Sequence, residues 1–343
     1  MKKYLLISII TAFLLIGCPE SNVINIIDVG WKPIEFPNKE LQITSIYFKD
    51  TLNGWVTAAL FKPYENKGNY ASIYYTNDGG KTWQEQLHID SNYFYEIDFW
   101  NDNYGFVLAK NGFIYETKDA GLNWQQRTLQ IDKITITNTF RDIFFQNENV
   151  AWLVGTYGTL LKTTDRGNSW QRLNLDTSTH LFGIHFFDNN NGIIIGGEDY
   201  IGQTDARIQI TTDGGNSWQT SLFVKGAFCR DADYNGDDVI VVGTEGLVAK
   251  SNNKGKDWEI ININAEYPIN SVAWQNENRA WAAGYYGQFY WTDDKGKTWK
   301  KYDTGNNVNY YDVKFLDELH GWLVGHFGSI LYTNNGGKDI IQE

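Results

Sequence analysis

The sequence predicts an all-β fold, a seven-bladed β-propeller built from four-stranded antiparallel blades. An octapeptide of the pattern Ser/Thr-x-Asp-x-Gly-x-Ser/Thr-Trp recurs seven times in 343 residues, at spacings of 40 to 48 residues. Between the copies, apolar residues alternate with a period of two, and helical periodicity is absent. A period near forty residues is typical of propellers and solenoids, and four short strands per period make one propeller blade.

The octapeptide has the chemistry of a tight turn. A short carboxylate or amide accepts hydrogen bonds from nearby backbone N–H groups, and the glycine adopts a positive φ without a Cβ clash. The third position is occupied by Asp78, Asp119, Asp165, Asp213, Asn253, Asp294 and Asn335. The last position begins the next strand and offers an apolar face to the core, and it is occupied by Trp83, Trp124, Trp170, Trp218, Trp258 and Trp299. We expect each Asp or Asn to hold its own turn and to contact no ligand.

The four strands of each repeat can be placed in order. The first strand is expected where the third and fifth residues of a segment are apolar, at residues 44–48, 95–99, 141–145, 182–186, 230–234, 270–274 and 311–315. The second strand begins with an aromatic or branched residue, at Trp55, Phe106, Trp152, Ile193, Ile240, Trp281 and Trp322. In several repeats it ends in a Gly-x-x-Gly hairpin. The third strand leads into the octapeptide, and the fourth begins at its tryptophan.

The two ends of the repeat region are expected to share one blade. The seventh octapeptide, residues 333–340, leaves room for only a very short fourth strand. Residues 29–34 precede the first full repeat and look like a detached fourth strand, with Trp31 in the tryptophan position. This segment is therefore predicted to complete the seventh blade and close the ring, which removes exposed sheet edges. Insertions at residues 60–72 and 198–206 lengthen the second hairpins of the first and fourth blades.

The first 17 residues predict a secretory signal peptide that is not part of the fold. Two lysines precede an apolar run over residues 4–16, which is too short to span a membrane. The run ends in Leu-Ile-Gly before Cys18, which resembles the bacterial lipobox, so we expect lipidation of Cys18. An ordinary cleavage site beside a cysteine is the alternative. Residues 18–27 would form a tether and residues 28–343 a single propeller, located in the bacterial cell envelope at the outer membrane or the outer face of the plasma membrane.

Composition agrees with export and excludes some partners. Besides Cys18 the chain has only Cys229, so we expect no disulfide and a buried core position for Cys229. The core must come from burial alone, which 14 Trp and 16% aromatic residues make feasible. A formal net charge of −12 argues against nucleic acid and against broad contact with anionic lipid. Membrane association would depend on a lipid anchor only.

The octapeptides resemble the Asp-box, also called the bacterial neuraminidase repeat, which sialidases, xyloglucan-cleaving glucanases and sortilin-type receptors carry. A block of the pattern Gly/Ala-Trp-x-Val-Gly-x-x-Gly precedes some copies, best seen at residues 321–328 and 151–158. The combination resembles the photosystem II stability and assembly factor family of seven-bladed propellers, over roughly residues 28–343. The resemblance implies the propeller fold and an assembly role on a nascent membrane complex, helped by a basic patch. In the inner ring predicted for this chain, only Arg141 and Arg230 are basic.

Candidate partner-binding residues gather on one face of the predicted disc. The loops that enter the innermost strands share this face with the second hairpins, and the octapeptide turns lie on the opposite face. The candidates are Tyr95, Arg141, Tyr157, Arg230, Tyr285, Tyr286, Tyr311, His326 and Phe327. Arg141 and Arg230 occupy equivalent places, and each precedes an aspartate. They could form a paired guanidinium site for a carboxylate or a peptide terminus, or internal ion pairs with those aspartates.

The predicted function is a non-catalytic, envelope-anchored binding or assembly scaffold for an envelope protein, an extracellular peptide or a glycan. The tyrosines would stack sugars, grip a peptide or cap the apolar layer between blades. The alternative is a glycoside hydrolase of the sialidase or glucanase type that uses two rim carboxylates. Carboxylates are available at Glu96, Glu198, Asp199 and Glu245, but their spacing singles out no pair. The sequence has no metal-ligand spacing, phosphate loop or nucleophile motif, so no cofactor or metal is expected.

Overall fold

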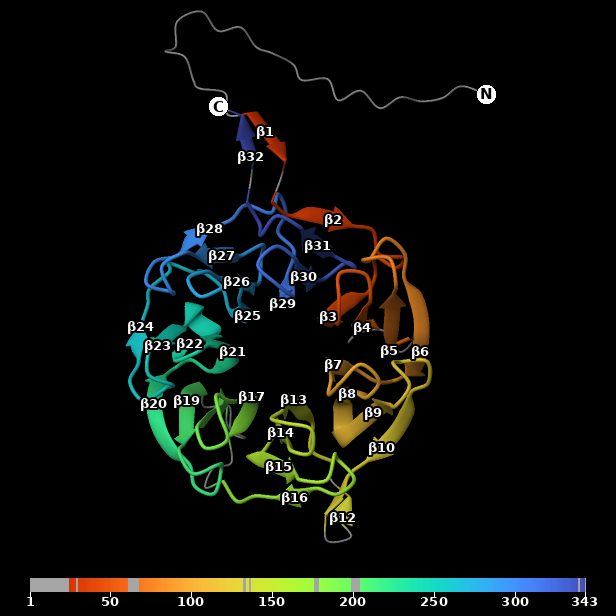
Figure 1. Ribbon diagram of the computed structural model, residues 1–343, viewed down its shortest axis with the longest axis vertical. Coiled ribbons are helices and arrows are strands. Elements are labelled where there is room, and N and C mark those ends of the chain that lie inside the picture. The colour runs from red at the N-terminus through yellow and green to blue at the C-terminus, as the bar shows by residue number, and fades with distance from the viewer. Residues whose placement is uncertain are drawn as a thin grey trace, which may run out of the picture.

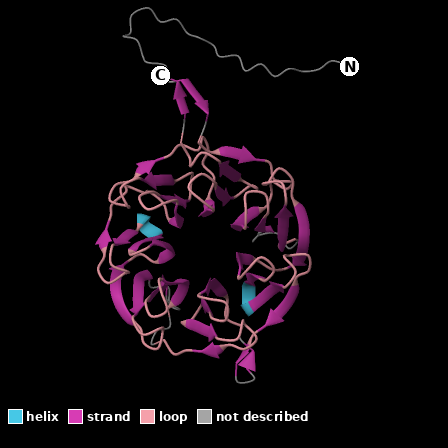
Figure 2. Ribbon diagram, in the orientation of Figure 1, coloured by secondary structure: helices cyan, strands magenta, loops and turns pink. Residues whose placement is uncertain are grey.

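The architecture is a ring of seven four-stranded antiparallel sheets, or blades (Figure 1). The computed structural model describes residues 25–28, 30–60, 68–131, 134–135, 137–175, 179–198, 204–338 and 340–342. In six blades the strands run from the ring axis outward in chain order, and in the seventh the outermost strand is the N-terminal β2. Within the described residues the helical elements are two short 3₁₀ turns, η1 (Lys110–Gly112) and η2 (Thr244–Gly246) (Figure 2). The predicted all-β seven-bladed propeller is confirmed.

The strands follow the predicted order within every blade. The innermost strands are β3 (Gln42–Phe48), β7 (Phe94–Phe99), β13 (Phe140–Phe145), β17 (His180–Phe186), β21 (Cys229–Asn235), β25 (Ile269–Trp274) and β29 (Tyr310–Phe315). The second strands are β4 (Gly54–Leu60), β8 (Gly105–Ala109), β14 (Ala151–Gly155), β18 (Gly192–Glu198), β22 (Asp238–Gly243), β26 (Ala280–Gly284) and β30 (Gly321–Gly325). The third strands are β5 (Tyr70–Thr76), β9 (Phe113–Thr117), β15 (Thr159–Thr163), β19 (Thr204–Thr211), β23 (Val248–Ser251), β27 (Phe289–Thr292) and β31 (Ile330–Thr333). The outermost strands are β6 (Gln84–Asp90), β10 (Gln125–Thr128), β16 (Gln171–Arg172), β20 (Gln219–Lys225), β24 (Glu259–Ile260), β28 (Lys300–Lys301) and β2 (Lys32–Ile34).

The N-terminal strand closes the ring, as predicted. Strand β2 pairs with β31 of the seventh blade, with Pro33 opposite Leu331. Trp31 is only 5% exposed and makes edge-to-face contacts with Trp281 and Phe289 of blade 6, at ring-centroid distances of 5.3 and 5.1 Å. This places Trp31 at the junction of two blades, where the octapeptide tryptophans of other blades also pack. Blade 7 is therefore built from both ends of the chain.

Two short pairs of strands lie outside the blades. Strand β1 (Asn25–Asp28) pairs with β32 (Ile340–Gln342), and this pair projects from the outer edge of the ring (Figure 1). Strands β11 (Gln130–Ile131) and β12 (Ile134–Thr135) form the other pair. No helix in the described part of the chain is long and apolar enough to cross a bilayer. The predicted signal peptide and Cys18 lie outside the described residues.

The core consists of apolar layers between neighbouring blades. The second-strand tryptophans are at most 1% exposed, and these are Trp55, Trp152, Trp281 and Trp322. Phe48 of blade 1 stacks on Trp322 of blade 7, with ring centroids 3.8 Å apart. Each such side chain contributes about 2 kcal/mol or more by burial. Cys229 is fully buried in the layer between blades 4 and 5, which agrees with its predicted core position.

The octapeptide turn is held by its aspartate, as the sequence suggested. In blade 1, the Thr82 backbone N–H donates to Asp78 Oδ1 at 2.9 Å and the Thr82 hydroxyl donates to Oδ2 at 2.6 Å. The Thr76 hydroxyl also donates to Asp78 Oδ1, and the Gly79 N–H donates to the Leu52 carbonyl in the preceding turn. The same carboxylate geometry recurs at Asp119, Asp165, Asp213 and Asp294.

Two copies carry asparagine in place of this aspartate. In the fifth copy, Asn253 Oδ1 accepts the Asp257 N–H at 2.9 Å, while Asn253 Nδ2 donates to the Asp257 carboxylate at 2.8 Å. The third residue is therefore the donor and the seventh residue the acceptor of the side-chain hydrogen bond, the reverse of the arrangement in the first copy. In the seventh copy, Asn335 Oδ1 accepts the Lys338 N–H at 3.2 Å. The turn thus requires an acceptor oxygen at the third position and not a charge.

Replacing Asp78 by alanine is expected to lower the free energy of unfolding by about 1 kcal/mol, because three hydrogen bonds at an exposed turn are lost. Asp78→Asn, which imitates the fifth copy, is expected to recover most of the loss. The Thr82 hydroxyl and N–H lower the pKa of Asp78 to about 2. Because the folded pKa is depressed, this contribution is present above about pH 4 and is lost as the pH falls toward 2. Urea unfolding at pH 7 and pH 2 measures both effects; an Asp78→Ala loss that is as large at pH 2 would contradict this account.

Candidate functional site

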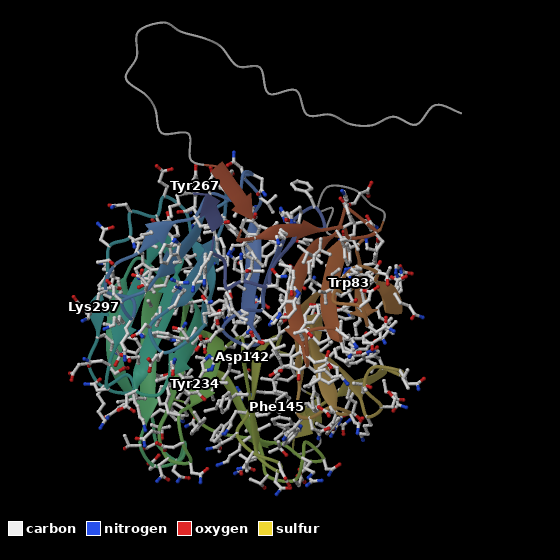
Figure 3. The ribbon with its side chains drawn as sticks, turned by 45° about the horizontal axis from the view of Figure 1, so that its top comes forward. Trp83, Asp142, Phe145, Tyr234, Tyr267 and Lys297 are labelled. Carbon is white, nitrogen blue, oxygen red and sulfur yellow. The ribbon has the colours of Figure 1, made fainter. Side chains whose placement is uncertain are left out.

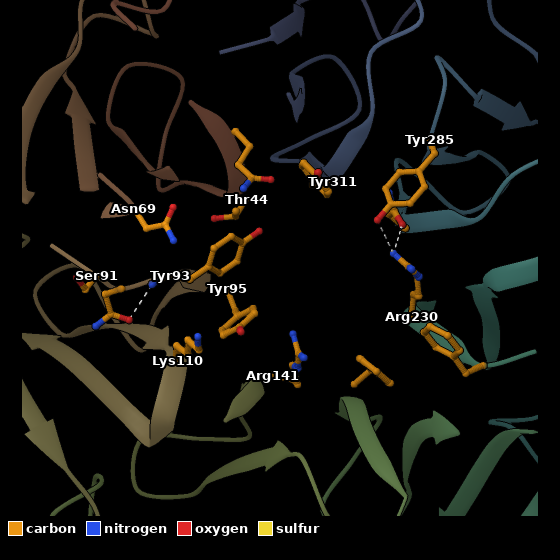
Figure 4. Close-up of a pocket in the computed structure, with 15 residues that line it drawn as sticks. Thr44, Asn69, Ser91, Tyr93, Tyr95, Lys110, Arg141, Arg230, Tyr285 and Tyr311 are labelled. Carbon is orange, nitrogen blue, oxygen red and sulfur yellow. Dashed lines mark hydrogen bonds between the residues drawn. The ribbon is translucent and has the colours of Figure 1, made fainter. Parts of the chain in front are cut away.

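A cavity of about 620 Å³ opens at the mouth of the central channel, on the face where loops enter the innermost strands (Figure 4). We call it the mouth cavity. Its cationic side chains are Lys110, Arg141 and Arg230, and its aromatic side chains are Tyr93, Tyr95, Phe182, Phe228, Tyr285 and Tyr311. The remaining lining is uncharged and comprises Gln42, Thr44, Asn69, Ser91, Asn92 and Asn270. Among the described residues, no carboxylate lines this cavity.

A β-bulge in each innermost strand directs one side chain to the mouth. In β13, Phe140 pairs with Gly155 and Asp142 pairs with Val154, so Arg141 is the extra residue between two paired positions. The same irregularity falls at Thr44, Tyr95, Phe182, Arg230, Asn270 and Tyr311. A bulge adds twist and re-aims the side chain of the extra residue. The repeat thus offers one variable side chain per blade to the mouth, beside core positions that stay apolar.

Arg230 is held in a fixed orientation by its neighbours. One terminal guanidinium nitrogen donates to Asn270 Oδ1 at 2.5 Å and to the Tyr285 hydroxyl at 3.2 Å (Figure 4). The guanidinium carbon also lies 5.2 Å from the centre of the Tyr285 ring and 5.3 Å from that of Phe228. Its Nε is buried and has no partner among the described residues, so the second terminal nitrogen is the donor left for a ligand. This arrangement pre-organises a strong donor at the mouth.

Arg141 contacts aromatic faces. Its guanidinium carbon lies 4.4 Å from the centre of the Tyr95 ring and 5.5 Å from that of Phe182. Its Nε is buried and has no hydrogen-bond partner in the described part of the protein. A guanidinium between two rings is stabilised by cation–π attraction while its donors stay unsaturated.

Tyr311 and His326 form a hydrogen-bonded pair at the edge of the mouth. The Tyr311 hydroxyl lies 2.6 Å from His326 Nε2, and the same nitrogen lies 3.2 Å from Gln42 Oε1. Burial raises the pKa of Tyr311 well above its usual range and lowers the pKa of His326. Both side chains are therefore uncharged near neutral pH, and the pair fixes the orientation of the Tyr311 ring.

The aspartates that follow the two arginines have a separate, structural role. Asp142 Oδ2 accepts the Ile184 N–H of the next blade at 2.7 Å, and Asp231 Oδ2 accepts the Val272 N–H at 2.9 Å. In the same way, Asp312 Oδ2 of blade 7 accepts the Ile46 N–H of blade 1 at 3.1 Å. Within the described residues, no ion pair joins Arg141 or Arg230 to these carboxylates. The aspartates tie adjacent innermost strands together and leave the arginines to the mouth.

Below the mouth the channel becomes acidic. Its lining includes Glu96, Asp142, Asp231, Asp312 and the cationic Lys314, and Figure 3 shows Asp142 near the ring axis and Lys297 at the outer edge. Burial raises the pKa of Asp98 to about 7 and that of Asp233 to about 6, and it also raises the pKa of Glu96, Asp142 and Asp231. The nearby carboxylates, Asp312 foremost, raise the pKa of Lys314. Below the mouth the channel therefore gains carboxylates, which share its lining with Lys314, Arg141 and Arg230.

The structure brings together five of the nine predicted rim residues. Those in the mouth cavity are Tyr95, Arg141, Arg230, Tyr285 and Tyr311. His326 lies beside them through its bond to Tyr311. Tyr157, Tyr286 and Phe327 do not line the cavity. They lie at hairpin tips with φ near +57°, and are 47%, 56% and 66% exposed.

The sequence analysis missed several mouth residues. Tyr93 and Phe228 directly precede the innermost strands β7 and β21, and Lys110 follows the second strand of blade 2. Lys110 occupies the place of Tyr285 when the second hairpins are aligned. That alignment could have found it, although blade 2 has Ala109 where other blades have the first glycine of the motif.

The mouth does not have the chemistry that the glycoside hydrolase alternative requires. Such an enzyme needs two carboxylates facing the scissile bond, and the described lining of the mouth has none. The nearest carboxylates lie deeper and accept hydrogen bonds from backbone N–H groups, as Asp142 and Asp231 do. In the described residues, no group of three His, Cys, Asp or Glu side chains is placed to hold a metal ion. The arrangement is suited to binding an anionic or aromatic ligand.

Two family profiles match the sequence. The profile described as "Photosynthesis system II assembly factor YCF48" matches residues 85–181, 173–272 and 263–334, which together span well over half of the chain. The profile described as "BNR/Asp-box repeat" matches residues 74–85, around the first octapeptide. A comparison with curated proteins gave no match.

Solved structures with the same architecture share little sequence with this chain. YCF48 bound to D1 peptide is 20% identical, with a TM-score of 0.69 over 90% of this chain and 99% of that one. YCF48 from Cyanidioschyzon merolae is 19% identical, with a TM-score of 0.67 over 89% and 98%. A catalytically inactive virginiamycin B lyase from Staphylococcus aureus with quinupristin is 12% identical, with a TM-score of 0.65 over 90% and 99%. At these identities the likeness shows the fold alone.

Proposed function

The chain belongs to the family described as photosystem II assembly factor YCF48, and from that premise we propose that it is a non-catalytic binding scaffold. Its ligand would be a peptide segment of a partner protein, held at the mouth cavity by a carboxylate and by apolar side chains. One observation carries the proposal: three cations and six aromatic rings, without a carboxylate, line a cavity in a protein of net charge −12. A cationic cavity in an otherwise acidic protein favours an anionic ligand.

The contacts indicate how such a ligand would be held. Arg230 would present its second terminal nitrogen from an orientation fixed by Asn270 and Tyr285. Arg141 has unsaturated donors beside the Tyr95 ring. Guanidinium groups bind carboxylates through charge-assisted, often bidentate hydrogen bonds. Glu96, Asp142, Asp231 and Asp312 lie below the mouth and would disfavour a ligand carboxylate that entered farther, so the bound group would stay at the mouth.

A relative supports the class of ligand. The solved YCF48 that carries a D1 peptide is a propeller of the same family and architecture. We extend to this chain the peptide as a class of ligand and not the D1 protein. The partner would be a protein of the cell envelope, because residues 1–18 have the pattern of a lipoprotein signal. A lipid on Cys18 would hold the propeller at the membrane, and β1 leaves the ring at its outer edge, away from the mouth.

The test is peptide binding by the arginine variants. We expect Arg141→Ala/Arg230→Ala to bind a selected peptide at least about 100-fold more weakly, because each charge-assisted bond to a carboxylate contributes roughly 1.5–3 kcal/mol and two are removed. Peptides are selected from a library displayed with free C-termini, and affinities are measured by fluorescence anisotropy. The same peptides with amidated C-termini report whether a terminal carboxylate is the group recognised.

The matched control is Arg166→Ala/Arg172→Ala. It removes the same charge from exposed positions in an octapeptide turn and on the outermost strand of blade 3. Circular dichroism and the thermal midpoint establish that both variants are folded. Equal weakening by the two double variants would show that only net charge matters, and selection of no peptide by the wild-type protein would reject the proposal.

A further inference from the structure

A second cavity, of about 300 Å³, lies at the outer edge of blade 6. We call it the rim cavity. Its walls are the connection from β24 to β25, the hairpin tip at Tyr286, and strands β27 and β28. It shares no lining residue with the mouth cavity, since Tyr285 lines the mouth and the next residue, Tyr286, lines the rim cavity. Figure 3 shows Tyr267, on the connecting segment, at the edge of the ring.

Aromatic rings form two walls of the rim cavity. Tyr267 and Tyr286 pack against each other with ring centroids 4.3 Å apart, yet they remain 39% and 56% exposed. Tyr286 has a φ of +56°, a conformation in which a bulky side chain is uncommon. Tyr290 and Trp299 lie on the other side. An exposed aromatic surface beside a cavity is the usual element that packs on the C–H face of a pyranose ring.

The polar groups of the rim cavity balance in charge. Glu266 supplies one carboxylate and Lys301 one ammonium group, and Asn264 adds an amide. Gln288 is 2% exposed; its Oε1 accepts the Glu266 N–H at 3.1 Å and the Tyr290 hydroxyl at 2.9 Å. Its Nε2 has no acceptor in the described part of the chain, which is costly for a buried amide. Mixed donors and acceptors with no net charge favour a neutral polyhydroxyl ligand over an anion or a cation.

The repeats provide an internal comparison for these residues. The hairpin-tip residues equivalent to Tyr286 are Asn111, Tyr157, Glu245 and Phe327, all with positive φ. The position equivalent to Gln288 is occupied by Phe113, Thr159, Leu247 and Ser329. Among these five blades, only blade 6 combines a tip tyrosine with a buried amide two residues later. A feature that the fold required would recur, so the combination indicates a role other than folding.

We propose that the rim cavity binds one neutral pyranose residue of a glycan. A volume of about 300 Å³ is at the lower end of ligand pockets and suits a single sugar unit. The sugar's C–H face would pack on Tyr286 and Tyr267, and its hydroxyls would bond Glu266, Asn264 and Lys301. This site is independent of peptide binding at the mouth. It would give the protein a second contact, with the polysaccharide that surrounds an envelope protein.

The probes are an array of neutral hexose and N-acetylhexosamine oligosaccharides, followed by calorimetric titration of the sugars that bind. Tyr286→Ala is expected to weaken binding at least about tenfold through the lost stacking area. Gln288→Leu, which places at this position the residue that blade 5 carries, is also expected to weaken it. Tyr157→Ala, at a similarly exposed hairpin tip of blade 3 with φ +57°, should bind as wild type does.

Each outcome bears on the proposal. Absence of any array signal for the folded wild-type protein would overturn it. Equal losses in Tyr286→Ala and Tyr157→Ala would place the sugar elsewhere. The mouth variant Arg141→Ala/Arg230→Ala is expected to bind the sugar as wild type does. If this variant lost sugar binding, the sugar would be assigned to the mouth cavity. A Tyr286→Ala variant that loses only the mouth peptide would make the rim cavity part of the peptide site.

Discussion

Gly215→Ala is expected to lower the free energy of unfolding by about 2–4 kcal/mol, because one added methyl group would collide with a buried tryptophan. Gly215 has a φ of +82°, and a Cβ built there would lie 2.3 Å from Cη2 of Trp152. Trp152 is fully buried in the layer between blades 3 and 4, so it has no room to withdraw. The octapeptide glycine of one blade therefore packs directly on the second-strand tryptophan of the preceding blade.

Gly226→Ala is the matched control for this prediction. Gly226 has nearly the same φ, +83°, but a Cβ there would meet nothing within 4 Å. Its cost is therefore the backbone conformation alone, about 1 kcal/mol. Thermal denaturation of the two variants separates the steric part from the conformational part. Equal midpoints would mean that the contact with Trp152 is relieved at no cost.

The second large effect is expected from Lys314→Met, with a loss of about 2 kcal/mol at pH 8 that becomes small at pH 5. Lys314 lies 4.0 Å from Asp312, and its charge also interacts with Asp231, Glu96 and Asp233. Removing it leaves these carboxylates without their cation, and the cost is below that of a fully buried pair because the Lys314 side chain is 48% exposed.

The pH dependence follows from the direction of the carboxylate shifts. Burial raises the folded pKa of Asp98 to about 7 and of Asp233 to about 6, above their unfolded values near 4. Below about pH 5 these groups are neutral when folded, and their contribution to stability falls as the pH rises from about 4, their unfolded pKa, to their folded pKa values of about 6 and 7. The raised pKa of Lys314 keeps it charged throughout this range. The variant should therefore lose stability with pH more steeply than wild type does.

Urea midpoints at pH 5, 6, 7 and 8 measure this slope. Lys297→Met removes the same charge from an exposed position at the outer edge of the ring (Figure 3). Its profile should run parallel to that of the wild-type protein. A parallel profile for Lys314→Met as well would show that the channel carboxylates do not depend on this cation.

The sequence predicted the fold well because the fold is repeated. Seven copies of one turn mark the blade boundaries. The detached fourth strand around Trp31 indicates which blade closes the ring. Alternation with a period of two also placed every innermost strand within a residue or two of its observed bounds. These are local signals, and each recurs often enough to be recognised.

The site was predicted only in part because it depends on geometry that no single repeat contains. Arg141 and Arg230 could be singled out by their equivalent positions, but the bulge that turns them to the mouth is not visible in their sequence. The sequence also does not show that each arginine faces the mouth while the aspartate after it bonds the neighbouring blade. Tyr157, Tyr286 and Phe327 were grouped with the mouth by position, whereas left-handed hairpin tips carry them outward. The rim cavity lies between the connection from β24 to β25 and the hairpin tip at Tyr286, and no sequence pattern indicates that these two segments meet.

The pairing of β2 with β31 also determines when the ring can close. The two strands are separated by about 300 residues, so this pair cannot form until β31 has been synthesised, and its loop-closure entropy grows only slowly with length. Until then, any blades already formed can only be an open arc with unpaired edges. The mouth cavity takes residues from β3 of the first blade and β29 of the last. A partner that binds there would therefore distinguish a finished molecule from an unfinished one.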